Sequence, residues 1–138
     1  MAEEQAPGGS EIERVASCAC GSLSVICRSE PALVALCHCR DCQRKTGVPF
    51  GIGAFYPRSA VTIDGESREY RRQSDSGHDV ENHFCPTCGS TVFWFPHRMP
   101  HLIAVAPGAF ADPHFPKPVK AVYGQHRHDW LHLDIPES

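Results

Sequence analysis

The sequence predicts a mainly β, single-domain protein with two packed antiparallel sheets and little helix. The chain of 138 residues has no internal repeat, which suits one domain with one core. Short apolar segments alternate with clusters of Gly, Pro, Asp and Ser, as expected for strands joined by turns. Twelve prolines disfavour long helices.

The sequence of the N-terminal part of the domain predicts three strands followed by one short helix. Two loosely alternating strands are expected at residues 13–18 and 23–28, with the turn at "CACG" between them. A third strand at residues 32–37 runs directly into "CHCRDC". The next residues, "RDCQRKTG", favour one or two helical turns that end at Gly47. Cys27, within the second strand, is predicted to be a small buried side chain rather than a reactive thiol.

From Val48 onward the sequence predicts only strands, separated by turn residues. They are expected at residues 48–56, 60–64, 68–73, 80–85, 90–96, 101–108 and 119–125. Gly51 and Gly53, within the first of these strands, indicate a bulge or a close backbone approach.

Residues 1–12 are predicted to be a flexible N-terminal tail that precedes the domain at residues 13–138. The tail is acidic and has no apolar segment, unlike a secretory signal or a transit peptide. No run approaches the ~18 apolar residues of a membrane helix. A cytoplasmic location is therefore expected, and disulfides are rare there. The eight cysteines are then more typical of metal ligands or catalytic thiols.

Two cysteine pairs lie on either side of "CHCRDC" in the sequence, and each is followed by a glycine. These outer pairs are Cys18 and Cys20 in "CACG", and Cys85 and Cys88 in "CPTCG". The second pair lies in "CPTCG", the form of a zinc knuckle, in which one turn places two sulfurs on one ion. Neither pair fills a tetrahedral site alone, but the two together make a closed four-cysteine site. The alternative for "CPTCG" is a thioredoxin-like redox pair, which should precede a helix. Here "STVFWF" follows instead, which is a strand pattern.

The middle group, Cys37, Cys39 and Cys42, offers three thiolates and no obvious fourth ligand. Three protein ligands and an open position are typical of catalytic zinc, whereas structural sites have four ligands. His38 stands between two of these cysteines and is expected to point away from a metal that both hold. A structural site completed by a distant histidine is the alternative that stays open. The histidines that would serve include His78, His83 and His97.

Charge indicates what an open three-cysteine site would do. Three thiolates and one Zn²⁺ give a local charge of about −1, which makes the metal a weaker Lewis acid than zinc on three neutral histidines. Such a site is poorly suited to making hydroxide and better suited to holding a further sulfur as a nucleophilic thiolate. Thiol chemistry is therefore favoured over hydrolysis.

The ordered motifs "CACG", "CHCRDCQRKTG" and "FCPTCG" resemble the family of glutathione-dependent formaldehyde-activating enzymes, which includes centromere protein V. Further landmarks are "PGAFADP" at residues 107–113 and Trp130, and the resemblance runs from about Val15 to Pro136. It implies a β-tent fold with two zinc ions per chain. It also implies the joining of glutathione and formaldehyde to S-hydroxymethylglutathione, which is carbon–sulfur lyase chemistry in reverse. The implied structural zinc ligands are Cys18, Cys20, Cys85 and Cys88, and the implied catalytic ones are Cys37, Cys39 and Cys42.

Glutathione carries two carboxylates, so a site for it should offer cations. The candidates for substrate contacts, close to the middle cysteines, are Arg40, Arg44 and Lys45. A second basic run is interpreted as a solvent-exposed face and comprises Arg68, Arg71 and Arg72. The candidate aromatic pocket walls are Phe50, Phe55 and Trp94.

The expected partners are a small thiol such as glutathione and a small aldehyde. The alternative function is a non-catalytic zinc module that recognises a protein or, less readily, a nucleic acid; an enzyme acting on another thiol adduct is a third. Seven ligand thiolates and two zinc ions would change the formal net charge of −3 to about −6. Nucleic-acid binders usually show a basic tail or stripe, so neither nucleic acid nor membrane is expected as a partner.

Overall fold

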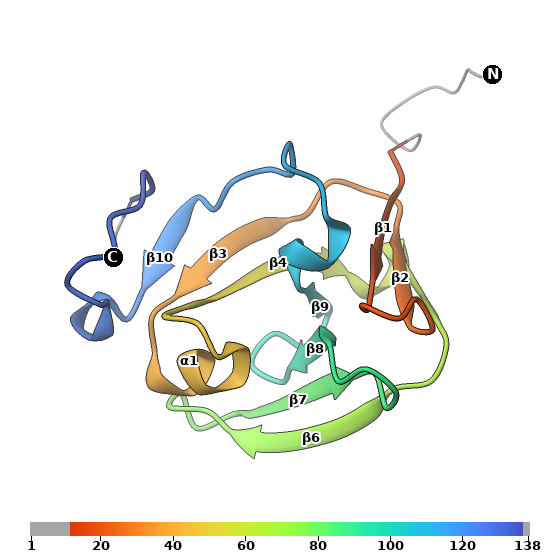
Figure 1. The fold of residues 1–138 in the computed structure, drawn as a ribbon, viewed down its shortest axis with the longest axis horizontal. Helices are drawn as coiled ribbons and strands as arrows, with labels where there is room; N and C mark the ends of the chain where they lie inside the picture. The colour runs from red at the N-terminus through yellow and green to blue at the C-terminus, as the bar shows by residue number, and fades with distance from the viewer. Residues whose placement is uncertain (1–11, 137–138) are drawn as a thin grey trace.

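Residues 12–136, the part of the chain that the computed structural model describes, contain two β-sheets, one α-helix and three short 3₁₀ helices (Figure 1). The 3₁₀ helices are η3 (Arg58–Ala60), η4 (Pro107–Phe110) and η5 (Gly124–His126). The smaller sheet has the strand order β1-β2-β5, and the larger one has the order β10-β3-β4-β9-β8-β7-β6. The predicted mainly β fold with little helix is thereby confirmed. The predicted tail at residues 1–12 lies outside the described residues except for Ile12. None of the described helices has the length and apolar character needed to span a membrane.

The smaller sheet is the N-terminal hairpin extended by one later strand. Its strands are β1 (Arg14–Ser17), β2 (Ser24–Cys27) and β5 (Val61–Asp64), and both pairings are antiparallel. The predicted turn at "CACG" joins β1 to β2, so the first predicted hairpin is confirmed.

The larger sheet contains the other seven strands. They are β3 (Leu33–Cys37), β4 (Gly51–Pro57), β6 (Arg68–Gln73), β7 (Asp79–Phe84), β8 (Thr91–Pro96), β9 (Leu102–Val105) and β10 (Lys120–Val122). All pairings are antiparallel except that of β10 with β3, which is parallel and departs from the expectation of purely antiparallel sheets. The reason is topological. Strand β9 already runs parallel to β3, and residues 106–119 are long enough to carry the chain across and start β10 in the same direction.

The core lies between the two sheets. Its largest fully buried side chains include Leu23 and Val25 from the hairpin, and Tyr56, Phe93 and Ile103 from the larger sheet. Strand β9 is buried along its whole length because it lies between β4 and β8, whereas β6 is an exposed edge strand. Apolar burial on the inner faces of both sheets therefore joins them.

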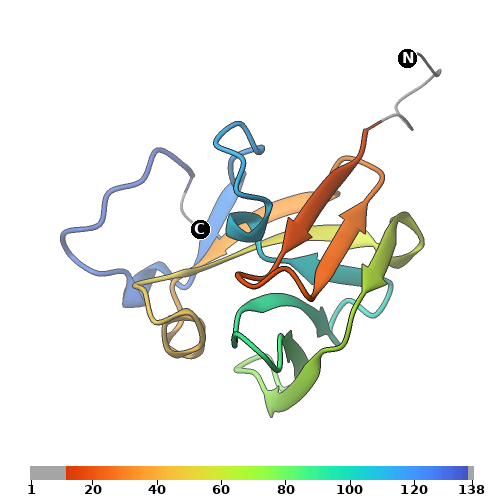
Figure 2. The same cartoon turned by 45° about the vertical axis from the view of Figure 1, so that its right-hand side comes forward.

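Helix α1 (Arg40–Thr46) follows β3 as predicted. Cys39 caps its N-terminus, and Gly47 ends it in the left-handed conformation with φ of 77°. Figures 1 and 2 show α1 on the left and the β1–β2 hairpin on the right, so the cysteine-rich segments at these two elements lie in separate parts of the fold.

Candidate metal centres

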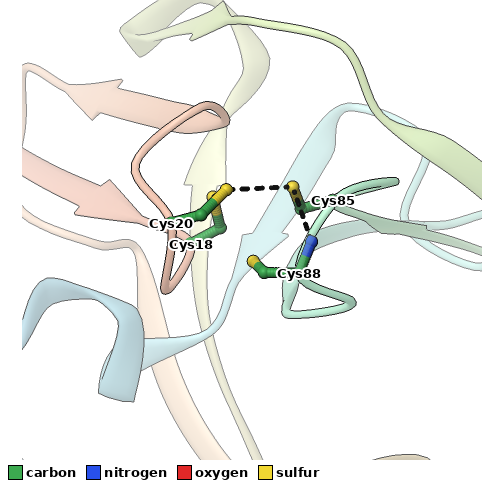
Figure 3. A group of neighbouring side chains, drawn as sticks. All are labelled: Cys18, Cys20, Cys85 and Cys88. Atoms are coloured by element: carbon green, nitrogen blue, oxygen red, sulfur yellow. Dashed lines mark hydrogen bonds between the residues drawn. The ribbon is translucent and has the colours of Figure 1, made fainter.

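Four cysteine sulfurs meet where the β1–β2 turn faces the β7–β8 turn (Figure 3). Cys18 and Cys20 come from the first turn, and Cys85 and Cys88 from the second, with all four sulfurs within 4.8 Å of one another. The Sγ atom of Cys20 is 3.7 Å from that of Cys18 and 3.7 Å from that of Cys85. Tetrahedral zinc with Zn–S bonds of about 2.3 Å places its sulfurs about 3.8 Å apart. The geometry of the four sulfurs therefore fits a zinc ion.

Backbone amides point at these sulfurs. The N–H of Leu23 donates to Cys18 Sγ at 3.2 Å, and the N–H of Thr87 donates to Cys85 Sγ at 3.3 Å. Gly21 and Gly89, which follow the second cysteine of each pair, have φ of 86° and 81°. Such positive φ values favour glycine and allow each turn to curl around its sulfurs. The N–H···S hydrogen bonds stabilise the charged thiolates that a metal requires.

Two serine hydroxyls extend this support. Ser22 Oγ lies 3.2 Å from Cys85 Sγ, and Ser90 Oγ lies 3.3 Å from Cys88 Sγ. The Ser90 hydroxyl is the largest cause that lowers the pKa of Cys88 to about 5, and the Ser22 hydroxyl is the largest that lowers the pKa of Cys85 to about 7. These serines were not among the residues predicted from the sequence, although "CGS" occurs at both pairs and is the available signal.

A second cluster, of three cysteines, forms at α1. Cys37 ends β3, Cys39 caps the helix and Cys42 lies in its first turn, and their sulfurs lie within 4.8 Å of one another. The N–H of Cys42 donates to Cys39 Sγ at 3.3 Å. Hydrogen bonds from the Cys37 and Cys42 thiols lower the pKa of Cys39, so this sulfur ionises most readily. The cluster therefore offers three closely spaced sulfurs for a second metal ion.

No fourth ligand joins this cluster from residues 12–136, since no His, Asp or Glu ligand atom completes the group. The imidazoles of His83 and His97 instead approach Glu81, with Nε2 to carboxylate distances of 3.0 and 3.2 Å. His38 is fully buried, and its backbone N–H donates to the carbonyl of Val122. His78 lies on the wall of the neighbouring cavity. This arrangement favours an open three-cysteine site over a site completed by a distant histidine.

Gly51 allows α1 to lie against the larger sheet. It pairs with Cys37 across β3 and β4, and a Cβ atom at this position would lie 2.9 Å from Cys42 Cβ. Only a residue without a side chain leaves Cys42 in its place. The close backbone approach predicted for this glycine is therefore confirmed.

A cavity of about 250 Å³ opens beside the three cysteines. Phe55 and Trp94 line it as predicted, whereas Phe50 does not. The cations on its wall are Lys45, Arg72, Arg98 and Lys120, and the carboxylates are Asp41, Asp75 and Asp79. The cluster thus lies at the wall of a mixed polar and aromatic cavity, which is typical of a small-molecule site.

Of the three predicted substrate contacts, only Lys45 lies on this cavity. Arg40 and Arg44 are exposed and lie outside it, and Arg44 lines a separate shallow pocket with His128. Burial lowers the pKa of Lys45 to about 8, while the nearby Cys42 thiolate opposes this effect.

The position of Arg72 differs from the prediction that it lies on a solvent-exposed face. Arg68 and Arg71 are solvent-exposed as expected, but Arg72 lines the cavity and its side chain is only 19% exposed. Its Nη1 atom donates to Asp41 Oδ2 at 3.0 Å, which joins β6 to α1. Arg72 is the only residue of β6 that is not exposed, and its place beside α1 depends on the contact with Asp41, 31 residues away in the sequence.

Cys27 is fully buried in the core, as predicted. Burial raises the pKa of its thiol to about 11, so it stays protonated and unreactive near neutral pH. It takes no part in either described cysteine cluster.

The fold and the two cysteine clusters define a class of small, mainly β domains with one four-cysteine and one three-cysteine candidate metal site. The family model for "Glutathione-dependent formaldehyde-activating enzyme" matches residues 13–126, and the chain belongs to this family. Similar solved structures include a crystal structure of a Rhodobacter sphaeroides protein, with a TM-score of 0.54 and 16% sequence identity, covering 90% of this chain and 99% of that one. At this identity the similarity concerns the fold alone. Comparison with curated proteins gives no match.

Proposed function

We propose that this protein is a zinc-dependent carbon–sulfur lyase of the glutathione-dependent formaldehyde-activating type, which forms or cleaves S-hydroxymethylglutathione or a related thiol adduct. The observation that carries the proposal is a three-cysteine cluster at the wall of a cavity, without a fourth protein ligand among the described residues. Membership of the family supports glutathione and formaldehyde as the substrates.

The cysteines of the open cluster, Cys37, Cys39 and Cys42, would hold the catalytic zinc. When bound there, zinc supplies a position for a substrate sulfur as thiolate. The four-cysteine cluster would hold a structural zinc that joins the two sheets. Its ligands would be Cys18, Cys20, Cys85 and Cys88.

The proposed reaction balances without any oxidant. In the direction of synthesis the thiol sulfur forms a bond with the formaldehyde carbon, and the C=O π electrons move to oxygen, which takes up a proton. The proton of the thiol leaves to solvent, so neither substrate is oxidised or reduced. Cleavage of the adduct is the same sequence in reverse.

The cavity residues contribute binding and orientation. Lys45 and Arg72 place positive charge on the cavity wall beside the cysteines, which suits an anionic substrate. Phe55 and Trp94 provide an apolar wall that limits access of water to the reacting atoms.

Exchange between glutathione, formaldehyde and their adduct, followed by NMR with and without the zinc-loaded protein, tests the proposal. We expect exchange to be faster than the spontaneous reaction. Cys39→Ser should remove one zinc and the acceleration yet leave the chain folded, whereas Cys88→Ser should unfold it because structural zinc contributes folding free energy. No acceleration by a fully loaded protein would contradict the lyase and favour a non-catalytic zinc module. Equal unfolding in both variants would contradict the assignment of the open site.

A further inference from the structure

The ammonium group of Lys45 is held on an aromatic face beside the open cysteine cluster. Its Nζ atom lies 3.4 Å from the centroid of the Trp94 ring, and both residues line the cavity with the three cysteines. A cation in this position is attracted by the ring quadrupole. The contact therefore restricts the most mobile part of the lysine side chain.

The Trp94 ring is itself fixed by the backbone beneath it. A Cβ atom at Gly53 would lie 2.9 Å from Trp94 Cζ2, so the indole packs directly on β4. The missing side chain of Gly53 leaves the space that the indole ring occupies, and any other residue would fill that space. The result is a stack in which the strand supports the indole and the indole supports the ammonium group.

The position of Lys45 relative to the cysteines follows from helix geometry. Lys45 comes three residues after Cys42 on α1, and side chains at this spacing lie on the same side of a helix. No carboxylate of residues 12–136 forms an ion pair with Lys45, whereas Arg72 on the same cavity is paired with Asp41. The positive charge of Lys45 thus remains available to the cysteine cluster.

The charge at this end of the cavity requires such a group. Three thiolates and one zinc ion give a net charge of about −1, and a substrate thiolate would make it about −2. A positive charge close to these sulfurs favours the deprotonated form of the incoming thiol.

We propose that Trp94 is a positioning residue that holds the Lys45 ammonium beside the three cysteines, where it offsets the negative charge gained when a thiol binds as thiolate. The inference rests on the proposed function, since it needs a thiol at the open site. On binding, the S–H bond breaks, its proton goes to the buffer and the sulfur keeps the electron pair that it presents to the metal; no oxidation takes place. The effect therefore applies to any thiol, whether or not it carries a carboxylate.

Thiol titrations of the full chain loaded with Co²⁺ in place of zinc test this role, because sulfur-to-cobalt charge-transfer absorption reports an added sulfur ligand. The probes are 2-mercaptoethanol, which is neutral apart from its thiol, and 3-mercaptopropionate, which carries a carboxylate. Lys45→Gln should weaken binding of both probes by about tenfold, the effect of about one pKa unit in the bound thiol. Lys45→Arg keeps the charge and should retain binding close to wild type.

Trp94→Leu should weaken binding of both probes less than Lys45→Gln does, and the double variant should lose less than the sum of the two. The matched control is Arg58→Gln, which removes a cation 4.3 Å from the Phe95 ring at a site that does not line the cavity. It should leave both affinities unchanged. Each variant must first be shown to hold two metal ions per chain.

Different outcomes separate this inference from the proposed function. Absence of thiol binding to the wild-type protein overturns both. If the wild type binds thiols and Lys45→Gln binds both equally well, only the role of Lys45 is overturned. If Lys45→Gln weakens 3-mercaptopropionate alone, Lys45 recognises a carboxylate and the charge-offset role is likewise overturned.

Discussion

Replacing Gly51 by Ala should release metal from the three-cysteine site and leave the four-cysteine site loaded. The added Cβ atom would lie 2.9 Å from Cys42 Cβ and 3.2 Å from Cys42 Sγ. Carbon atoms pack at about 3.5 Å or more, so Cys42 must move by about 0.6 Å. Metal–ligand distances tolerate only about 0.2 Å. Overpacking of this kind costs about 1–3 kcal/mol, which corresponds to about fivefold to 150-fold weaker metal binding if this site bears the cost.

Chelator competition measures this effect directly. Zinc release from wild-type protein, Gly51→Ala and the control Gly108→Ala is followed at increasing chelator concentration, with circular dichroism as a check on folding. Gly108 has an ordinary φ and no atom within 4 Å of an added Cβ, so its variant should retain the wild-type profile. Gly51→Ala should lose one zinc per chain early and keep the other. An unchanged release profile for Gly51→Ala would refute the view that close packing on β4 sets the position of Cys42.

Three further variants probe the surroundings of the sites. Ser90→Ala removes a hydroxyl that stabilises its neighbouring thiolate, and chelator competition should show about tenfold weaker zinc binding at the four-cysteine site; unchanged affinity would contradict this role. Asp41→Asn breaks the ion pair with Arg72 and should lower the free energy of unfolding, measured in urea, by about 1 kcal/mol. Adding Arg72→Gln to this variant should lower the free energy little further, and a further loss equal to that of Arg72→Gln alone would show that the two residues act independently. The hydrogen bond from His83 is the largest cause that lowers the pKa of Glu81 below its ordinary value of 4.5. The ionised Glu81 therefore stabilises the fold fully above about pH 4.5, and this contribution is lost as the pH falls through the pKa of Glu81 in the folded protein. Glu81→Gln should therefore flatten the dependence of Tm on pH in acid, and an unchanged slope would exclude this contribution.

The candidate ligands could be predicted from the sequence because their spacing is local. Cys37, Cys39 and Cys42 lie within six residues, and a strand followed by a capped helix is enough to bring their sulfurs together. Each outer pair is likewise confined to one turn. The packing of the two sheets brings the two outer pairs together. The only signal of this in the sequence is that a tetrahedral ion needs four sulfurs and each pair supplies two.

Other parts of the site depend on contacts that no local pattern records. Arg72 lies in an exposed edge strand, and only the position of α1 beside that strand gives its inward side chain a partner in Asp41. The parallel pairing of β10 follows from the path of residues 106–119, a segment with few strand or helix signals. Lys45 could be selected by its nearness to Cys42, but the Trp94 ring that holds it comes from a strand far along the chain.

The two clusters differ in how much of the chain must be ordered before they exist. Closing the four-cysteine site brings together residues 65 positions apart, from Cys20 to Cys85, and this carries the entropy cost of a long loop. The three cysteines of the other cluster lie within six consecutive residues, so bringing them together closes only a short loop, and packing against Gly51 on β4 then sets the position of Cys42. During synthesis the three sulfurs of that cluster are thus available to an ion once residue 42 emerges, whereas the four sulfurs of the other site come together only after Cys88 has been added and the two turns have met.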